Sequence, residues 1–334
     1  MKVTLSRAAE FFKQNNYFTL LCHANPDGDT LGSGYALCGV LHLMGKYARL
    51  RCADEPSPRF AYLKDALVPG LDVFPEGVSE TIVAVDVADT ELLGDLKHEY
   101  AKFDFCVDHH ISNKLYAEQT LLDSSAAACA EVVWDLICEL KNLLALVNDV
   151  ELLLTPQVAA AVYTGVSTDT GCFRFSNTTP KSHRIAADVM EYGFDVAKIN
   201  YLMFEMKTRK RLELEQKALA GVEFFYGGKC AVITLTVDML EGIDPADTGG
   251  VSVLSKQVEG VDVGVIIKER DPAKELNAWK ISLRTNTNIN AQAICCTFGG
   301  GGHMRAAGCK IKGTLDEVKE LVLAEIAKQV ECVK

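Results

Sequence analysis

Short apolar runs alternate with longer helical stretches over the first part of the chain. The short runs are rich in β-branched and aromatic residues, so we expect strands at 18–22, 48–52, 81–85 and 103–107. The longer stretches predict helices at 31–46, 125–141, 156–166 and 181–192. This alternation is typical of an α/β fold with a doubly wound, mostly parallel sheet, in which ligands bind at the carboxyl ends of the strands.

The pattern changes after residue 192. Residues 193–220 are charged and helical in period, whereas the rest of the chain carries shorter β-rich runs and a terminal helix at 315–330. We therefore expect a first domain over 1–192, a helical connector over 193–220 and a smaller α+β domain over 221–334. The active site is expected in the cleft between the two domains.

Composition narrows the class of protein. With 334 residues and 49% apolar content, the chain is long enough for about two domains with their own cores. No apolar stretch reaches the ~18 residues of a membrane helix, and the N-terminus is charged where a signal peptide is apolar, so we expect a cytoplasmic protein. The twelve cysteines form no CxxC pair, which favours reduced, buried thiols over disulfides or a zinc-thiolate site.

The net charge of −11 argues against a long nucleic acid as the partner, because affinity for such chains depends on Lys and Arg residues that neutralise many phosphates. Small phosphorylated ligands remain compatible with this charge. Metal ions and a few local arginines can offset it at a site.

Acidic residues and histidines follow the predicted strands. Asp27 and Asp29 stand on either side of Gly28 in a predicted turn, and His23 lies at the end of the preceding strand. Gly28 lets the backbone curl so that both carboxylates can face one cation, whereas an exposed Asx-rich turn is the simpler alternative. Asp86 follows the strand at 81–85 between apolar residues, where a buried carboxylate needs a partner such as a cation. A helix cap or a solvated turn is the alternative for Asp86.

The triplet Asp108-His109-His110 follows the strand at 103–107. A solitary histidine in such a place is more often structural, but two adjacent histidines point in different directions, so one can bind metal while the other approaches a substrate. Asp169 lies in the small-residue stretch 167–171, a predicted polar turn that can approach an anion. Structural or exposed roles are expected for the isolated histidines His42, His98 and His183.

Four carboxylates and two histidines, with no cysteine, predict a site for Mn²⁺ or Mg²⁺, and the imidazoles favour Mn²⁺. The set is Asp27, Asp29, Asp86, Asp169, His23 and His109. Two such ions about 3.5 to 4 Å apart can hold a hydroxide between them and stabilise the charge that develops on phosphoryl oxygens. The clustering therefore predicts phosphoester hydrolysis.

A second set of polar and glycine residues lies toward the C-terminal end of the chain. The glycines at 299–302 are closed by His303 and followed by Arg305, and Arg284 lies upstream on a predicted strand. Glycine runs are usually flexible turns, but exposed amides with an imidazole and a guanidinium can form a phosphate cradle. Bases can stack on aromatic rings, although core packing is the commoner role. The aromatic residues considered for stacking are Phe173, Phe175 and Phe298.

These motifs resemble those of the DHH phosphoesterases, a family named for the triplet found here at 108–110, and the resemblance spans nearly the whole chain. The segment 23–29 resembles the first family motif, Asp86 the second, and Asp169 within 167–171 the fourth. The segment 300–308 resembles the signature of the DHH-associated C-terminal substrate domain.

The resemblance implies a role for each residue. One Mn²⁺ would be held by His23, Asp27, Asp86 and Asp169, and the other by Asp29, Asp86, His109 and Asp169. Mg²⁺ or Co²⁺ would be substitutes. His110 would lie near the scissile phosphate as a stabiliser or proton donor, and Asp108 would orient the histidines. A terminal phosphate or nucleotide would be held by Arg284, Gly300, Gly301, Gly302 and His303.

Within the family, the compact two-domain form is most similar to the oligoribonucleases that degrade nanoRNA to mononucleotides and dephosphorylate 3'-phosphoadenosine 5'-phosphate. Stand-alone phosphodiesterases of cyclic di-AMP or of its linear product pApA are a close alternative, and a non-catalytic nucleotide sensor is a remoter one. Family II pyrophosphatases end in a different substrate domain. The resemblance thus implies short RNA or small nucleotides as substrates, no membrane partner, and a homodimer.

Overall fold

The computed structural model describes residues 1–148, 152–243, 251, 254–286 and 288–330. The chain divides into two compact units, Met1–Met206 and Lys207–Lys334. The division falls within the segment 193–220 that the sequence predicts as a connector. None of the described helices combines the length and the apolar composition needed to cross a membrane.

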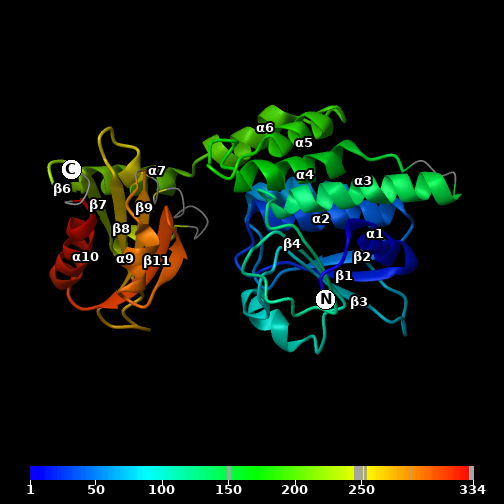
Figure 1. The fold of residues 1–334 in the computed structure, drawn as a ribbon, viewed down its shortest axis with the longest axis horizontal. Coiled ribbons are helices and arrows are strands. Elements are labelled where there is room, and N and C mark those ends of the chain that lie inside the picture. Colours follow the sequence, from blue (N-terminus) through cyan, green and yellow to red (C-terminus); the bar gives the residue numbers. More distant parts are fainter. Residues whose placement is uncertain (149–151, 244–250, 252–253, 287, 331–334) are drawn as a thin grey trace. The chain divides into compact units, whose positions relative to one another are not determined.

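A five-stranded sheet forms the centre of the first unit (Figure 1). Its strands are β1 (Tyr17–Leu21), β2 (Tyr47–Arg51), β3 (Thr81–Val85), β4 (Phe105–Asp108) and β5 (Gln119–Leu122), in the spatial order β2-β1-β3-β4-β5. Every described pair in this sheet is parallel. β3 and β4 are almost wholly buried because both faces of the sheet are covered.

Long helices pack over one face of this sheet (Figure 1). The helices of the unit are α1 (Leu5–Gln14), α2 (Gly28–Leu43), α3 (Cys129–Asn148), α4 (Pro156–Asp169), α5 (Pro180–Met190) and α6 (Val196–Asn200). The core between helices and sheet includes Phe12, whose ring lies 5.5 Å from that of Phe18 and 5.1 Å from that of Phe105. Burying each such ring contributes roughly 1.5–3 kcal/mol. The opposite face packs against the 3₁₀ segment η2 (Thr90–His98) through Leu93 and Leu96.

The second unit contains a six-stranded mixed sheet in the order β10-β11-β9-β8-β7-β6. The strands are β6 (Glu223–Phe225), β7 (Cys230–Leu235), β8 (Val263–Glu269), β9 (Ala278–Thr285), β10 (Gly301–His303) and β11 (Ala306–Lys312). Within this second sheet, β7 and β8 are parallel, and the other described pairs are antiparallel. One face packs on α9 (Ala291–Cys296) and α10 (Leu315–Val330), and part of the other packs on α7 (Arg209–Ala220) and the 3₁₀ turn η5 (Leu254–Lys256).

The sequence prediction of a mostly parallel α/β sheet followed by a smaller α+β unit is confirmed. Several predicted helix boundaries were wrong. α2 covers 28–43 where 31–46 was expected, α4 continues to Asp169, and α3 runs from Cys129 to Asn148. The segment 193–220 contains α6, the π-helical turn η3 (Tyr201–Glu205) and α7. α1 and β5 were not expected, because both are short and α1 is polar on its outer side.

Candidate metal centre

The strand order places the ends of β1, β3 and β4 at one edge of the sheet. The connection from β1 leads outward to β2, whereas the connection from β3 leads the other way to β4, so the chain reverses its winding between β1 and β3. Such a switch point is where open α/β sheets bind ligands. His23 follows β1, Asp86 follows β3 directly and Asp108 ends β4.

Asp27 and Asp29 lie at the start of helix α2, not in a turn as the sequence suggested. The Asp27 side chain caps the helix, since its Oδ1 accepts hydrogen bonds from the backbone N–H groups of Asp29 at 3.0 Å and Thr30 at 3.1 Å. The Asp29 carboxylate is buried and accepts hydrogen bonds from the backbone N–H groups of Cys129 at 2.6 Å and Ala130 at 2.9 Å. These two amides begin helix α3, whose N-terminal dipole favours a negative charge.

A close approach of α2 and α4 brings Asp29 and Asp169 to the same place. A Cβ on Gly32 would lie 2.5 Å from the carbonyl oxygen of Ala161, and a Cβ on Gly165 would lie 2.9 Å from Asp29 Oδ1. Only glycine leaves room for these contacts. Asp169 is the last residue of α4, so the predicted polar turn at this position was wrong.

Six side chains converge here. His23 Nε2 lies 3.6 Å from Asp27 Oδ1 and 3.7 Å from Asp86 Oδ2. His109 Nε2 lies 3.6 Å from Asp86 Oδ1, 3.8 Å from Asp29 Oδ2 and 4.0 Å from Asp169 Oδ2. These separations exceed hydrogen-bond lengths. They match the separation of about 3 to 4 Å between two ligands of one ion bound at ~2.1 Å.

Asp86 provides the test of whether a cation fits. Its side chain is buried, and its Oδ1 atom has no hydrogen-bond partner in the described structure. Its backbone adopts a φ of 60°, a left-handed conformation that is uncommon for a residue with a side chain. Burial, followed by the charges of Asp29 and Asp27, raises the pKa of Asp86 well above its ordinary value. Divalent cations would supply the missing partner, so the residues present fit the metal.

Two further carboxylates have raised pKa values. Burial and the nearby charges of Asp29 and Asp27 raise the pKa of Asp169 to about 8. Burial also raises the pKa of Asp29, although the positive end of helix α3 and His109 oppose this shift. Carboxylates that repel each other in this way are stabilised by a cation placed between them.

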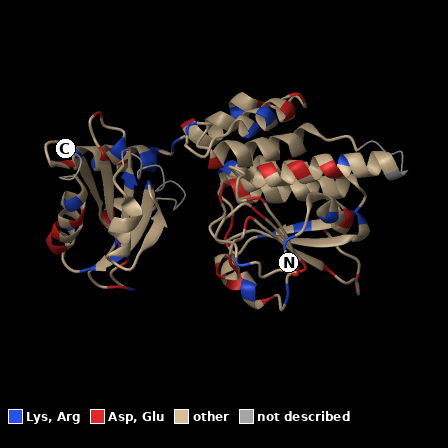
Figure 2. Ribbon diagram, viewed as in Figure 1, with Lys and Arg blue, Asp and Glu red and all other residues tan. Residues whose placement is uncertain are grey.

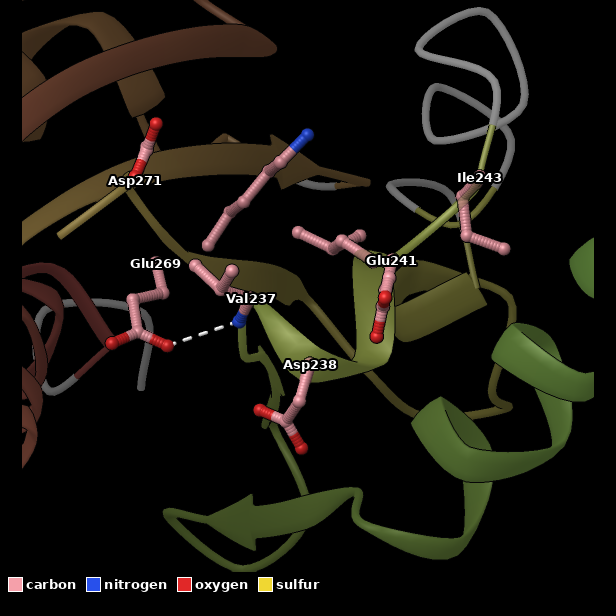
Figure 3. Close-up of a pocket in the computed structure, with 8 residues that line it drawn as sticks. Val237, Asp238, Glu241, Ile243, Glu269 and Asp271 are labelled. Atoms are coloured by element: carbon pink, nitrogen blue, oxygen red, sulfur yellow. Dashed lines mark hydrogen bonds between the residues drawn. The ribbon is translucent and has the colours of Figure 1, made fainter. Parts of the chain in front are cut away.

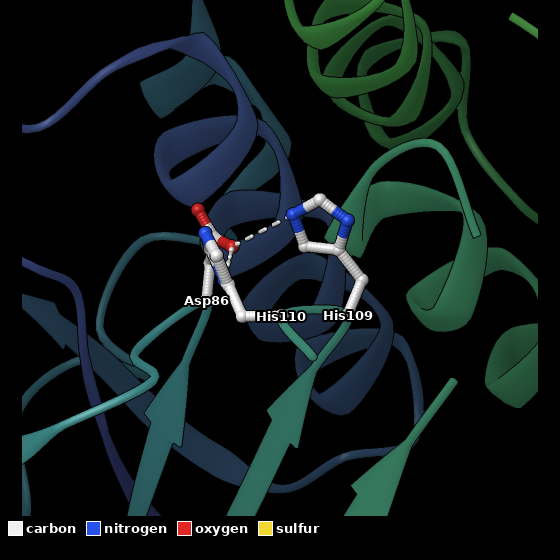
Figure 4. Close-up of side chains that lie close together, drawn as sticks. All are labelled: Asp86, His109 and His110. Atoms are coloured by element: carbon white, nitrogen blue, oxygen red, sulfur yellow. Dashed lines mark ion pairs between the residues drawn. The ribbon is translucent and has the colours of Figure 1, made fainter. Parts of the chain in front are cut away.

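Both adjacent histidines approach Asp86, whose Oδ1 lies 3.6 Å from His109 Nε2 and 3.5 Å from His110 Nδ1 (Figure 4). His109 faces Asp86, Asp29 and Asp169, whereas His110 is 40% exposed and its Nδ1 hydrogen-bonds to Asp108 Oδ1 at 2.8 Å. That hydrogen bond raises the pKa of His110. Asp108 is fully buried and orients the triplet, because its Oδ1 also accepts hydrogen bonds from the backbone N–H groups of both histidines.

Asn113, which the sequence did not suggest as a site residue, donates from Nδ2 to Asp108 Oδ2 at 2.6 Å. Burial alone would raise the pKa of Asp108, but the hydrogen bonds from His110 and Asn113 lower it. An asparagine three residues after a histidine pair was the available signal. The supporting amides of Cys129 and Ala130 left no signal, because any residue supplies an N–H group.

The predicted substrate residues lie together in the second unit. Arg284 on β9 pairs in register with Ala306 on β11, and Ala306 pairs with His303 on β10. Two of the four glycines before His303, Gly300 and Gly302, stand where a side chain would not fit. A Cβ on Gly302, at a φ of 139°, would lie 2.6 Å from the carbonyl oxygen of Ala306. Gly300 likewise abuts the backbone of Gly308.

The isolated histidines and the three phenylalanines have local partners or remain exposed. His42 is buried, and its Nε2 lies 2.8 Å from the carbonyl oxygen of Ala48, which confirms a structural role. His183 stacks on Phe173 at 5.0 Å between ring centroids, whereas Phe175 is exposed. Phe298 packs against the core of the second unit.

Two family models match the chain. The model described as the DHH family, N-terminal domain, matches residues 18–166, and the DHHA1 domain model matches residues 229–331.

Several relatives carry one name. A protein of Thermus thermophilus named bifunctional oligoribonuclease and PAP phosphatase NrnA is 34% identical over 92% of this chain and 88% of its own length. Proteins of the same name from Mycoplasma pneumoniae and Bacillus subtilis are 22% and 23% identical, over 98% and 86% of this chain and 97% and 87% of their own lengths.

Solved structures share the fold. An exopolyphosphatase-related protein from Bacteroides fragilis superposes with a TM-score of 0.80 at 20% identity, over 97% of this chain and 95% of its own. RecJ from Thermus thermophilus in complex with Mn²⁺ gives a TM-score of 0.55 at 15% identity, over 99% of this chain and 55% of RecJ.

Proposed function

The chain belongs to the DHH family of phosphoesterases, and on this premise we propose that it is a Mn²⁺-dependent enzyme that hydrolyses short oligoribonucleotides to mononucleotides and dephosphorylates 3'-phosphoadenosine 5'-phosphate to AMP. The observation that carries the proposal is the convergence of acidic residues and histidines around Asp86, at distances that suit a metal ion. It is found in a chain 34% identical to a protein named bifunctional oligoribonuclease and PAP phosphatase NrnA.

Two ions would be held by the six clustered side chains. His23, Asp27, Asp86 and Asp169 would bind one, and Asp29, Asp86, His109 and Asp169 the other. The support for sharing is that the two oxygens of Asp86 face different histidines, Oδ2 toward His23 and Oδ1 toward His109. The bound metals, Mn²⁺ or its substitutes Mg²⁺ and Co²⁺, would supply an activated water at neutral pH and neutralise charge on the phosphoryl group.

His110 would act on the leaving group. Asp108 forms a hydrogen bond with Nδ1 of the His110 ring, so Nε2 of that ring would be available to the substrate. Because its pKa is raised, the imidazolium form persists to higher pH and can donate the Nε2 proton to the departing ribose oxygen. Asp108 keeps its negative charge during this transfer, since its own pKa is lowered.

Arg284, Gly300, Gly301, Gly302 and His303 would hold a terminal phosphate. Arg284 and His303 are in one register row of the second-unit sheet, and Gly301 and Gly302 precede His303 on β10, which supports this role. Burial lowers the pKa of Arg284, but a guanidinium keeps its charge at neutral pH.

Product analysis tests the proposal. The purified protein with Mn²⁺ is incubated separately with labelled RNA of two to five nucleotides, 3'-phosphoadenosine 5'-phosphate, pApA, cyclic di-AMP and pyrophosphate, and the products are separated by ion exchange. Mononucleotides from short RNA and AMP from 3'-phosphoadenosine 5'-phosphate are expected. Preferential cleavage of cyclic di-AMP or pApA would replace the assigned substrate, and tight binding without product would favour a sensor.

A further inference from the structure

Cys295 and Cys309 face each other in the core of the second unit. Cys295 lies on α9 and is buried, and Cys309 lies on β11 with an exposed fraction of 7%. Both belong to the core between the sheet and α9, and both thiols are free. A hydrogen bond between the two thiols raises the pKa of Cys295 and lowers the pKa of Cys309. The two sulfur atoms are therefore neighbours.

Gly300 contacts both cysteines through its backbone. Its N–H group donates a hydrogen bond to the carbonyl oxygen of Cys295 at 2.9 Å. A Cβ on Gly300 would lie 2.5 Å from the Cβ of Cys309, so the glycine is in close contact with β11. These backbone contacts bring α9 and β11 together independently of the thiols. The next residue, Gly301, begins β10, the strand that carries His303.

Arg284 is a further group near this pair. Burial lowers the pKa of Arg284, and the charge of the Cys295 thiolate opposes that shift. The guanidinium in turn opposes the rise in the pKa of Cys295. Charges influence each other in this way only over short distances. The thiol pair therefore lies close to Arg284 and, through Gly300, is connected to His303.

The chain around Cys295 carries little charge. The segment 286–304 contains no Asp, Glu, Lys or Arg, so α9 is tan in Figure 2. A disulfide is uncharged and can stay in an apolar core, whereas a buried thiolate needs a charged or hydrogen-bonding partner. The surroundings of Cys295 and Cys309 thus suit both the reduced pair and the disulfide.

The hollow that Figure 3 shows in the same unit has a different character. Acidic residues, among them Asp238 and Glu241, line it together with Lys268. One of its carboxylates, Glu269, accepts a hydrogen bond from the backbone N–H of Val237 at 3.0 Å. None of the described residues that line it is a cysteine, so this hollow offers a thiol oxidant no target.

We propose that Cys295 and Cys309 are a thiol pair that a peroxide converts to a disulfide, and that this disulfide weakens nucleotide binding by the second unit. The Cys309 thiolate attacks one oxygen of hydrogen peroxide, and the other oxygen leaves as water after protonation. The Cys295 sulfur then attacks the sulfenic acid and releases a second water. The two sulfurs lose two electrons in total, and these reduce the O–O bond of the peroxide.

The disulfide would act on the binding residues through Gly300. An S–S bond is ~2.05 Å long, so the two sulfurs must move closer than any contact between thiols allows. Gly300 contacts both cysteines and has no free space toward Cys309, so it must shift, and His303 on β10 follows. This consequence rests on the proposed function, in which Arg284 and His303 hold a terminal phosphate, whereas formation of the disulfide does not.

Peptide mapping tests the disulfide. Trypsin places Cys295 and Cys309 on different peptides, 285–305 and 306–310. The reduced full-length protein is treated with hydrogen peroxide, its remaining thiols are alkylated, and a non-reducing digest is analysed by mass spectrometry. We expect these two peptides to be joined within one chain and to be separated by dithiothreitol.

The variant C296S provides the control for the map, because Cys296 is the exposed thiol next to Cys295. It should give the same cross-link as the unsubstituted protein. A link through Cys296, a link between two chains, or no link at all would overturn the proposal.

Hydrolysis tests the consequence for binding. After oxidation, kcat/KM should fall about 10- to 100-fold on 3'-phosphoadenosine 5'-phosphate and stay within about twofold on bis-p-nitrophenyl phosphate, a small ester with little to bind in the second unit. Dithiothreitol should restore the activity. C309A and C295A should both resist the loss, because neither can form the disulfide.

C230A is the matched control for these two variants. Cys230 is a buried thiol of the same core on β7, which is three strand spacings, or roughly 14 Å, from β11. The oxidised C230A protein should lose activity as the unsubstituted protein does. A similar loss in oxidised C309A, or equal losses on both substrates, would overturn the consequence, since oxidation of Cys22 beside His23 would impair both reactions.

Two readouts do not depend on catalysis. If the reduced protein hydrolyses no nucleotide, the proposed function fails, and the peptide map still decides whether the disulfide forms. Hydrogen exchange of the backbone amides at 299–303 should be faster in the oxidised protein, because the hydrogen bond from Gly300 to Cys295 is disturbed. Unchanged exchange in a protein shown to contain the disulfide would overturn the coupling to β10.

Discussion

At the residue scale, Asp86 determines what the cluster can do. Its left-handed backbone costs about 1–3 kcal/mol, and its buried Oδ1 lacks a hydrogen bond within the described residues. Both features of Asp86 lower the stability of the fold, so we expect a further interaction, such as a bound cation, to stabilise this residue. Its two carboxylate oxygens face His23 and His109 on different sides, which is the arrangement a bridging metal ligand requires.

Asp108 provides a prediction for catalysis. D108N keeps the shape of the side chain but removes the charge that raises the pKa of His110. If His110 is the proton donor, as proposed, activity is lost as the pH rises through its pKa, so the alkaline limb of the kcat profile should move to lower pH in the variant. We expect kcat to fall about 10- to 100-fold. Steady-state kinetics between pH 6 and 9 measure both effects.

An unshifted alkaline limb in folded D108N would contradict the role of His110 as the proton donor. N113A is the matched comparison, because it removes one hydrogen bond from Asp108 and leaves the charge. It should not move the limb to lower pH, since the charged carboxylate that raises the pKa of His110 is still present.

The sequence predicted which acidic residues and histidines cluster, because they follow apolar runs and because their types are unusual in such places. It could not predict which groups support them. Asn113 and the amides of Cys129 and Ala130 hold Asp108 and Asp29 through folding of distant segments, and backbone amides have no signature in a sequence.

At the scale of elements, the crossing of α2 and α4 sets the geometry of the site. Asp29 in the first turn of α2 meets Asp169 at the end of α4 because Gly32 and Gly165 allow the two backbones to touch. The boundaries of both helices were mispredicted for the same reason. Glycine and short polar residues have low helix propensity, so 27–29 and 167–169 resemble turns until tertiary packing is included.

Gly165 tests this crossing. A Cβ at this position would collide with the Cβ of Ala130 and lie 2.9 Å from Asp29 Oδ1. G165A should therefore lower the free energy of unfolding by about 1–3 kcal/mol, although alanine favours helix. It should also weaken Mn²⁺ binding by displacing Asp29. Chemical denaturation and metal titration measure the two effects.

The double variant G165A/A130G provides the control, because it removes the Cβ of Ala130 that the new methyl group meets. Recovery of part of the lost stability and metal affinity is expected. Equal stability of G165A and the unsubstituted protein would show that the helix crossing has more room than the structure indicates.

At the scale of the whole molecule, the two units differ in charge as well as in fold. Lys and Arg nearly balance Asp and Glu in Lys207–Lys334, so the net charge of −11 comes from Met1–Met206. The change in hydrophobic pattern along the chain was enough to predict an α/β unit followed by a smaller one. It was not enough to place the division, because α6 joins the first unit through tertiary contacts of Ile199 and Asn200.

Clustered carboxylates make the stability of the metal-free protein depend on pH. The pKa values of Asp86, Asp29 and Asp169 are raised above their ordinary value in the folded state, to about 8 for Asp169. The folded state then binds more protons than the unfolded state, so the stability from these groups is complete below pH ~3.8 and is lost as the pH rises toward ~8. The melting temperature in EDTA should fall between pH 5 and pH 8.

Added Mn²⁺ should raise the melting temperature most at pH 8, since binding requires the deprotonated carboxylates. D86N should flatten the pH dependence in EDTA, whereas D95N, at an exposed position of η2, should not. A melting temperature in EDTA that is independent of pH would argue against repulsion among these carboxylates.

The most direct measurement of the central claim is the number of Mn²⁺ ions bound per chain, determined by equilibrium dialysis with electron paramagnetic resonance, together with the rate of short-RNA hydrolysis in the same samples. The unsubstituted protein should bind two ions, with activity appearing as the second site fills. D86N should lose the shared ligand, retain at most one ion and lose more than about 10³-fold in kcat. Two tightly bound ions and full activity in folded D86N would contradict a metal centre bridged by Asp86.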